Sequence, residues 1–172
     1  MLNGGSSSGK TTIAACLQDI LPSPWLRLGV DTLIDTLPQR LLTSETGIEI
    51  GSDGSVRPGQ EFRRLELAWM QGIAAMVHAG AHIIIEDVFV SGVDTRNRWQ
   101  AALAGISVLW VGVHCDPIVA TERERERGNR VTGMAQVQAQ MVHAGMAYDL
   151  EVDTSATSAM ECAQRIAQLI DD

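Results

Sequence analysis

The sequence lacks a positive charge balance, a long apolar run and a recognisable leader segment. Its 21 aspartates and glutamates outnumber its 13 lysines and arginines, which gives a formal net charge of −8. Binding to nucleic acid or to an anionic membrane needs a positive surface, so we expect neither as a partner. No apolar run approaches the ~20 residues of a membrane span, and residues 1–4 have neither the basic nor the apolar part of a signal peptide. We therefore expect a cytoplasmic protein.

Cysteine and lysine are also scarce. The three cysteines, Cys16, Cys115 and Cys162, are odd in number and widely spaced, so we expect buried thiols rather than a disulfide framework. The four histidines show no metal-ligand spacing with them, which disfavours a zinc site. Lys10 is the only lysine among the 13 basic residues, and its position is therefore of interest.

A chain of 172 residues fits one compact domain. Apolar, β-rich runs alternate with helical patterns along it, which predicts a single α/β domain with a central parallel sheet. The predicted strands cover residues 25–30, 82–87, 106–115 and 150–152, and the predicted helices cover residues 10–21, 60–79, 94–104, 117–127, 134–144 and 156–170.

Residues 43–59 break this alternation. They alternate briefly between apolar and polar side chains around an expected hairpin turn at Asp53-Gly54. The segment is either a tolerated surface insertion or a flap that covers substrate, and the sequence favours neither.

The segment GGSSSGKT, residues 4–11, matches the phosphate-binding motif G-x-x-x-x-G-K-[ST]. Its glycines let consecutive backbone N–H groups converge on phosphate oxygens, and the helix that starts near Lys10 directs its positive end at the same anion. Lys10 supplies a mobile cation for the β- and γ-phosphates of ATP, and Thr11 offers a hydroxyl to Mg²⁺. A flexible Gly/Ser turn would not explain why the sole lysine stands here. We assign the nucleotide site, within a three-layer P-loop NTPase fold, to Gly4, Gly5, Ser6, Ser7, Ser8, Gly9, Lys10, Thr11 and Thr12.

An apolar strand that ends in two acids, Glu86 and Asp87, supports this assignment. In P-loop enzymes an acid at this place orients the shell of Mg²⁺. Many α/β strands end in acids, so the pattern carries weight only together with the loop. We favour Asp87, with Thr11, for the metal, and Glu86 is the close alternative.

Residues 121–131 (TERERERGNRV) place Arg123, Arg127 and Arg130 at i, i+4 and i+7 on one helical face. Like charges at this spacing repel each other. A solvated helix with salt bridges is the plain alternative. Guanidinium groups gathered beside a phosphate site instead fit a short helical lid over residues 121–133 that closes on the nucleotide, which we favour. All three arginines are then nucleotide-binding candidates, and Arg127 joins Lys10 among the catalytic candidates.

Asp31 follows a predicted strand, at the sheet edge where ligands bind in parallel α/β folds. Phosphoryl transfer to an alcohol needs a group that accepts the hydroxyl proton, and an aspartate does this in protein kinases. Asp35, one helical turn further on, is the competing candidate, and a helix N-cap is the structural alternative for Asp31. We favour the catalytic role for Asp31.

The acceptor side carries mostly apolar side chains and no cluster of arginines. An anionic acceptor would need such a cluster as a clamp, so we expect a neutral and partly apolar small-molecule alcohol. Most of the same side chains would also serve in a hydrophobic core. They are Leu33, Ile34, Leu37, Trp69 and Met70.

The chain resembles the chloramphenicol 3-O-phosphotransferases, which are antibiotic-modifying P-loop kinases. The segments that carry the resemblance are LNGGSSSGKT, LPSPWLRLGVDTLIDTLP, AGAHIIIEDVFVSG, VLWVGVHCD, RGNRVTGMA and YDLEVDTS, spread over nearly the whole chain. The resemblance implies ATP- and Mg²⁺-dependent phosphorylation of a primary hydroxyl of chloramphenicol or a similar molecule, with antibiotic inactivation as its result. It also implies that Asp31 is the general base, that the three lid arginines bind nucleotide, and that the protein is cytoplasmic and self-associating.

Two features depart from that family. The family begins with a hydrophobic strand before the phosphate loop, whereas this sequence offers only Met1-Leu2-Asn3. A strand of ~5 residues is typical, so we hypothesise that the natural protein begins upstream. The acidic pair is Glu86-Asp87 where the family tends to show two aspartates, which leaves the choice between the two acids open.

Two other functions stay open. A P-loop kinase of another small metabolite or nucleotide is one, because a fold does not fix its acceptor. An ATP-binding protein without kinase activity is the other, and ATP binding without turnover of any acceptor would identify it.

Overall fold

The computed structural model describes residues 1–51, 55–127 and 133–170. Its main sheet has five strands in the order β2-β5-β1-β6-β7, and every neighbouring pair in it is parallel. The predicted central parallel sheet is therefore confirmed. The strands are β1 (Leu2–Asn3), β2 (Trp25–Gly29), β5 (His82–Asp87), β6 (Val111–His114) and β7 (Leu150–Asp153).

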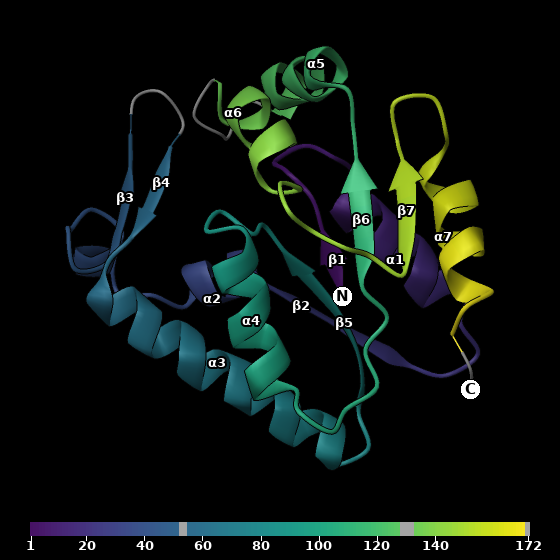
Figure 1. Ribbon diagram of the computed structural model, residues 1–172, viewed down its shortest axis with the longest axis horizontal. Coiled ribbons are helices and arrows are strands. Elements are labelled where there is room, and N and C mark those ends of the chain that lie inside the picture. Colours follow the sequence, from purple (N-terminus) through teal and green to yellow (C-terminus); the bar gives the residue numbers. More distant parts are fainter. Residues whose placement is uncertain (52–54, 128–132, 171–172) are drawn as a thin grey trace.

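Helices cover both faces of this sheet, which gives three layers (Figure 1). Helices α1 and α7 pack with Leu2, Ile84 and Val111 in one apolar cluster, and α3 and α4 pack with Ile85 and Phe89 in another. Adjacent residues of β5 thus enter opposite cores, as expected for a strand that is buried on both faces. The helices are α1 (Lys10–Ile20), α2 (Val30–Asp35), α3 (Gln60–His78), α4 (Val93–Ala102), α5 (Pro117–Arg127), α6 (Met134–Met141) and α7 (Ala159–Ala167).

The strand predicted over residues 106–115 is shorter than expected. Only Val111–His114 form β6, because both of its neighbours, β1 and β7, begin opposite Val111. The preceding residues have no ladder to join there. Helix α7 also begins later than predicted, at Ala159, since Ser158 and Glu161 form a capping box that fixes its start.

Residues 43–59 form a hairpin of their own. Strands β3 (Ile48–Ile50) and β4 (Val56–Pro58) pair antiparallel in a separate two-stranded sheet. A third apolar cluster holds the hairpin through Ile48, which packs with Leu33, Leu41 and Phe62. The predicted turn at residues 53–54 lies outside the described residues. Figure 1 shows the hairpin on one side and α5 and α6 on the other side of the region above the sheet.

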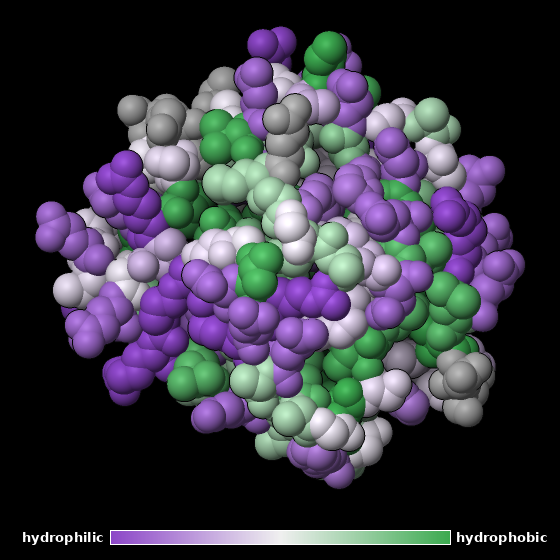
Figure 2. Space-filling view, viewed as in Figure 1, coloured by the Kyte–Doolittle hydropathy of each residue, from purple (hydrophilic) through white to green (hydrophobic). Residues whose placement is uncertain are grey.

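The surface is mixed in polarity. On the face in Figure 2, hydrophilic residues prevail and apolar residues form several small groups. The large exposed apolar side chains belong to β2, to α3, α4, α5, α6 and α7 and to the segment after α7, so they do not single out one face for self-association, which stays a prediction. Within the described ranges, no helix is both long enough and apolar enough to cross a membrane.

Candidate active site

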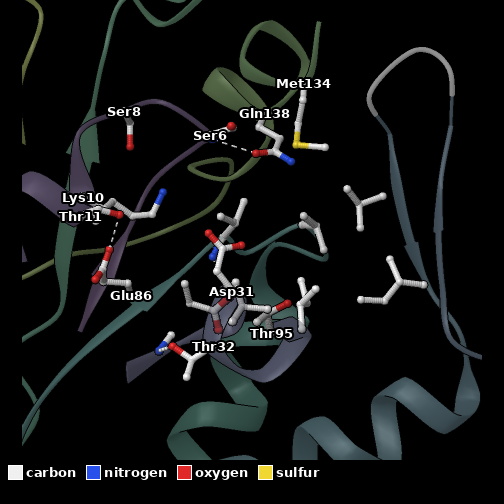
Figure 3. Close-up of a pocket in the computed structure, with 18 of the residues that line it drawn as sticks. Ser6, Ser8, Lys10, Thr11, Asp31, Thr32, Glu86, Thr95, Met134 and Gln138 are labelled. Carbon is white, nitrogen blue, oxygen red and sulfur yellow. Dashed lines mark hydrogen bonds between the residues drawn. The ribbon is translucent and has the colours of Figure 1, made fainter. Parts of the chain in front are cut away.

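A cavity of about 310 Å³ opens at the carboxyl ends of β2 and β5 (Figure 3). The phosphate loop, α2, the hairpin, the start of α3 and one side of α6 form its walls. The sequence-predicted residues that line it are Ser6, Ser7, Ser8, Gly9, Lys10, Thr11, Asp31, Ile34, Asp35, Glu86 and Asp87. One cavity therefore brings together the loop, the acid after β2 and the acidic pair of β5.

The phosphate loop has the geometry of an anion site. Ser7 and Gly9 have positive φ angles, 57° and 90°, so the backbone curls between β1 and the start of α1. The hydroxyl groups of Ser6, Ser7 and Ser8 are buried and have no hydrogen-bond partner among the described residues. Buried polar atoms without a partner are costly, and phosphate oxygens would satisfy these three groups. The loop residues thus fit a nucleotide phosphate chain.

Lys10 lies inside this loop. It is 8% exposed, and its Nζ donates to the carbonyl oxygens of Gly4 (2.7 Å) and Gly5 (2.8 Å). Gly4 and Gly5 therefore position the lysine and do not line the cavity. A side chain at Gly4 would meet the Val113 carbonyl at 2.5 Å. Thr12 is exposed on α1 and also lies outside the cavity wall.

The two acids of β5 point to different partners. Glu86 accepts a hydrogen bond from Thr11 Oγ1 at 2.8 Å and lies 3.4 Å from Arg27 Nε. Asp87 accepts bonds from Trp99 Nε1 (2.5 Å) and Val88 N (2.6 Å). Strand alternation explains the split, because Glu86 shares the side of Ile84, which faces α1, and Asp87 shares the side of Ile85, which faces α4.

Burial also distinguishes the two acids. Asp87 is 4% exposed, and the loss of solvent raises its pKa to about 6, although the bonds from Trp99 and Val88 lower it. The sequence favours Asp87 for the metal, whereas the geometry favours Glu86, which bonds the Thr11 hydroxyl. Within the described ranges, no group of three or more His, Cys, Asp or Glu residues could hold a metal. Thr11 and Glu86 suit Mg²⁺ held mainly by phosphate and water oxygens.

Asp31 and Asp35 both lie on α2, which starts at Val30 immediately after β2. Both are exposed residues of the cavity wall. Gly29 pairs with Glu86 across β2 and β5, so the first turn of α2, which carries Asp31, begins beside the acidic pair. Asp35 lies one turn further from the sheet edge. The structure leaves both acids as candidates, and Figure 3 shows Asp31 among the residues of the cavity wall.

The opposite wall of the cavity is apolar. Of the five predicted acceptor-side residues, only Ile34 lines it, while Leu33 and Leu37 belong to the hairpin cluster and Met70 to the core under α3. The hairpin itself provides much of this wall, as a substrate-covering flap would. The apolar residues that line it are Val30, Ile34, Ile48, Val56, Pro58, Phe62, Val88, Val90 and Met134.

Two arginines pair with an acid of this cavity in a cluster that the sequence does not predict. Buried Glu66 of α3 lines the cavity, and its carboxylate binds Arg63 at 2.8 Å and lies 3.3 Å from Arg98 Nε. Neither arginine lines the cavity, and both are turned to Glu66. The i, i+3 spacing of Arg63 and Glu66 is visible in the sequence, but the contact with Arg98 depends on how α4 packs on α3.

Arg123 of α5 holds the phosphate loop through Thr154, a contact that the sequence does not predict. Arg123 donates to the Thr154 carbonyl (2.7 Å) and to Thr154 Oγ1 (3.0 Å), and that hydroxyl donates to the Ser8 carbonyl (2.8 Å). Arg123 therefore supports the phosphate loop from behind and does not line the cavity. Arg130 lies outside the described residues, and so does the side chain of Arg127.

Three residues that line the cavity belong to no sequence motif. Arg27 reaches the rim from β2, Thr95 lines the floor from α4, and Gln138 enters from α6. Gln138 is 3% exposed, and its Oε1 accepts a bond from Ser6 N at 2.8 Å. An uncharged amide within a helix gives no sequence signal, because its role depends on the approach of α6 to the loop.

Comparisons with known proteins agree with this geometry. A family model described as chloramphenicol phosphotransferase-like protein matches residues 1–171. A Mycobacterium tuberculosis (strain H37Rv) protein named "Putative O-phosphotransferase" is 33% identical over 183 residues, covering 96% of this chain and 79% of that protein.

Solved structures with low sequence identity share the fold. The Deinococcus radiodurans tunicamycin resistance protein matches with a TM-score of 0.67 and 20% identity, covering 97% of this chain and 92% of its own. A sugar kinase from Janibacter sp. HTCC2649 matches with a TM-score of 0.68 and 19% identity (97% and 90% covered). Shikimate kinase from Acinetobacter baumannii, in complex with shikimate, has a TM-score of 0.60 and 13% identity (98% and 89% covered). The fold is therefore that of the P-loop NTPases, as predicted.

Proposed function

The chain belongs to the chloramphenicol phosphotransferase-like protein family, and from this premise we propose that it moves the γ-phosphate of ATP to the primary hydroxyl of chloramphenicol or a similar neutral alcohol. The family and the kinase fold support a P-loop phosphotransferase. The acceptor, the antibiotic inactivation and the cytoplasmic location are our proposal. One observation carries it: a single cavity joins the phosphate loop, the carboxylate of Asp31 and an apolar wall.

The loop residues bind the donor in this proposal. The amides and hydroxyls of residues 6–11 surround the phosphate chain, and Lys10 leaves the Gly4 and Gly5 carbonyls to pair with phosphate oxygens. Thr11 and Glu86 would hold Mg²⁺, which when bound offsets the negative charge of the phosphates.

Asp31 accepts the proton of the acceptor hydroxyl as the new bond to phosphorus forms. Its exposed carboxylate at the start of α2 faces the cavity from the end of β2, where acceptor and donor would meet. The hairpin and α2 bury the apolar part of the acceptor against Ile34, Ile48 and Phe62. Exclusion of water from this space limits hydrolysis of ATP.

The charge of the acceptor side supports a neutral acceptor. Glu66 is ion-paired with both Arg63 and Arg98, so its single negative charge offsets part of their positive charge. Asp31 and Asp35 add negative charge to the same cavity. A carboxylate or phosphate on the acceptor would meet repulsion here without an arginine clamp.

Acceptor-dependent release of ADP tests this proposal. We expect ADP to form with chloramphenicol, and no increase over the acceptor-free rate with shikimate or with AMP, which are anionic. Turnover of either anionic compound in preference to chloramphenicol would contradict a neutral acceptor. ATP binding with no turnover of any acceptor would instead identify a nucleotide-binding protein without kinase activity.

A further inference from the structure

Gln138 is a buried polar side chain that α6 contributes to the cavity wall. It lies on α6, is 3% exposed, and accepts the backbone N–H of Ser6 at 2.8 Å (Figure 3). A backbone N–H can donate only to the oxygen of the amide, so this bond fixes which way the side chain is turned. The Nε2 group must then point away from Ser6, on the cavity side.

That Nε2 group has no hydrogen-bond partner among the residues that the structure describes. It carries two N–H donors, which a ligand in the cavity could use. Gln138 lines the cavity together with Asp31, Lys10 and Thr11. These donors therefore belong to the wall of the same cavity that holds the phosphate loop and the acid that would accept the hydroxyl proton.

Contacts at both ends of α6 hold Gln138 in this position. At the start, the buried carboxylate of Glu124 accepts bonds from Gly133 N and Ala135 N, both at 2.8 Å. Just beyond the other end, Asn3 Nδ2 donates to the Val142 carbonyl at 2.8 Å. Gly5 permits the close approach of loop and helix, because a side chain there would meet Gln138 Cβ at 3.3 Å. Such support is what a preorganised donor requires.

We propose that Gln138 is a catalytic residue whose Nε2 donates a hydrogen bond to the phosphoryl group during its transfer, while Oε1 holds the loop at Ser6. The proposal rests on the proposed function. In the reaction the acceptor oxygen bonds to the γ-phosphorus as the bond from that phosphorus to the bridging oxygen of ATP breaks. ADP keeps the electron pair, and the proton of the acceptor goes to Asp31. Gln138 makes and breaks no covalent bond, and its N–H stabilises charge on the oxygens of the transferring group.

The Q138E variant distinguishes the role of the Nε2 donor from that of the Oε1 acceptor. A carboxylate oxygen still accepts the Ser6 N–H, but the donor is gone and a negative charge faces the transferring group. Loss of such a donor lowers kcat by about 10²- to 10³-fold in other enzymes, which is the fall we expect. We also expect weaker binding of ATP and unchanged binding of ADP, because ADP lacks the group that Nε2 contacts. Gln136 lies exposed on the same helix, and Q136E is the matched control that should keep wild-type values.

A second variant guards against a folding defect. Q138M keeps the length of the side chain without adding charge, and we expect a similar fall in kcat with ADP binding retained. A kcat within about threefold of wild type in either folded variant would overturn the proposal, because Gln138 would then only support the loop. Equal losses of ADP and ATP affinity would also overturn it. A wild-type protein that phosphorylates no acceptor would overturn the proposed function itself, and the role of Gln138 with it.

Discussion

At the scale of single residues, substitutions of Asp31 and Asp35 can be compared to identify the proton acceptor. Both are exposed aspartates of α2 that line the cavity, one helical turn apart. We predict that Asp31→Asn lowers kcat for phosphoryl transfer by about 10²- to 10⁴-fold, the usual contribution of a general base. ATP binding should persist, since the loop is untouched. Steady-state kinetics on Asp35→Asn should give near-wild-type values, and the reverse result would move the proton acceptor to Asp35.

Glu86 and Asp87 allow a similar comparison for the metal. The contact of Glu86 with Thr11 predicts that E86Q raises the Mg²⁺ concentration for half-maximal activity about tenfold or more, as loss of a metal-orienting group does. The carboxylate of Asp87 instead accepts hydrogen bonds from Trp99 Nε1 and Val88 N. Magnesium titrations of the two variants check this. A higher Mg²⁺ requirement in D87N but not in E86Q would restore the assignment that the sequence favours.

At the scale of helices, the side chain of Glu124 joins α5 to the start of α6. This carboxylate is 3% exposed and caps the start of α6 through two backbone amides. We predict that E124A lowers the free energy of unfolding by about 1–3 kcal/mol, because one buried and one partly buried N–H group lose their partner. Urea unfolding measures this loss. E122A, at an exposed position of the same helix, is the control, and equal stability of the two variants would contradict the capping role.

How far the sequence predicts the site depends on whether the residues are contiguous. The phosphate loop is one unbroken motif, so its position and its helix follow from the sequence alone. The roles of Glu86 and Gln138 depend on which helix packs beside them. Strand alternation predicts that Glu86 and Asp87 face opposite ways, but only the packing shows that α1 covers the Glu86 side.

The arginines of the predicted lid illustrate the same limit. Their spacing predicts a common helical face, yet Arg123 is bound to Thr154, a residue 31 positions further along the chain. The length of β6 is a further example. Its apolar run predicts a strand over residues 106–115, but strand length in a sheet is set by the neighbours, and β1 and β7 reach only to Val111.

At the scale of the whole molecule, a polar cluster joins three strands and the segment after α6. His143 Nδ1 lies 2.8 Å from the Tyr148 hydroxyl, which accepts a bond from Asn3 of β1, and the His143 ring stacks on His114 of β6 at 3.9 Å. His114 Nε2 lies 2.6 Å from Glu151 of β7. Burial, and next the nearby His114, lower the pKa of His143 from 6.5 to about 4.

This shift makes stability depend on pH with a defined sign. Between pH 6.5 and about 4 the unfolded chain binds a proton at His143 that the folded chain does not, so stability falls as the pH falls through this window. The free energy of unfolding of the wild type should therefore decrease between pH 6.5 and about 4. We predict that H143Q makes this decrease smaller by about 1–2 kcal/mol, after allowance for solvent screening of a partly exposed ring. Urea unfolding at several pH values checks it, with H78Q as the control. An identical pH dependence in wild type and H143Q would contradict the role of His143.

The central claim is that the phosphate loop and the adjoining cavity serve one reaction, phosphorylation of a neutral alcohol. The mass of chloramphenicol after incubation with the protein, ATP and Mg²⁺ tests it most directly. We predict the gain of one phosphoryl group with wild-type protein, and a rate lower by about 10²-fold or more in Lys10→Ala, which lacks the cation of the loop. Unmodified chloramphenicol in the presence of bound ATP, or equal product from wild type and Lys10→Ala, would contradict the account.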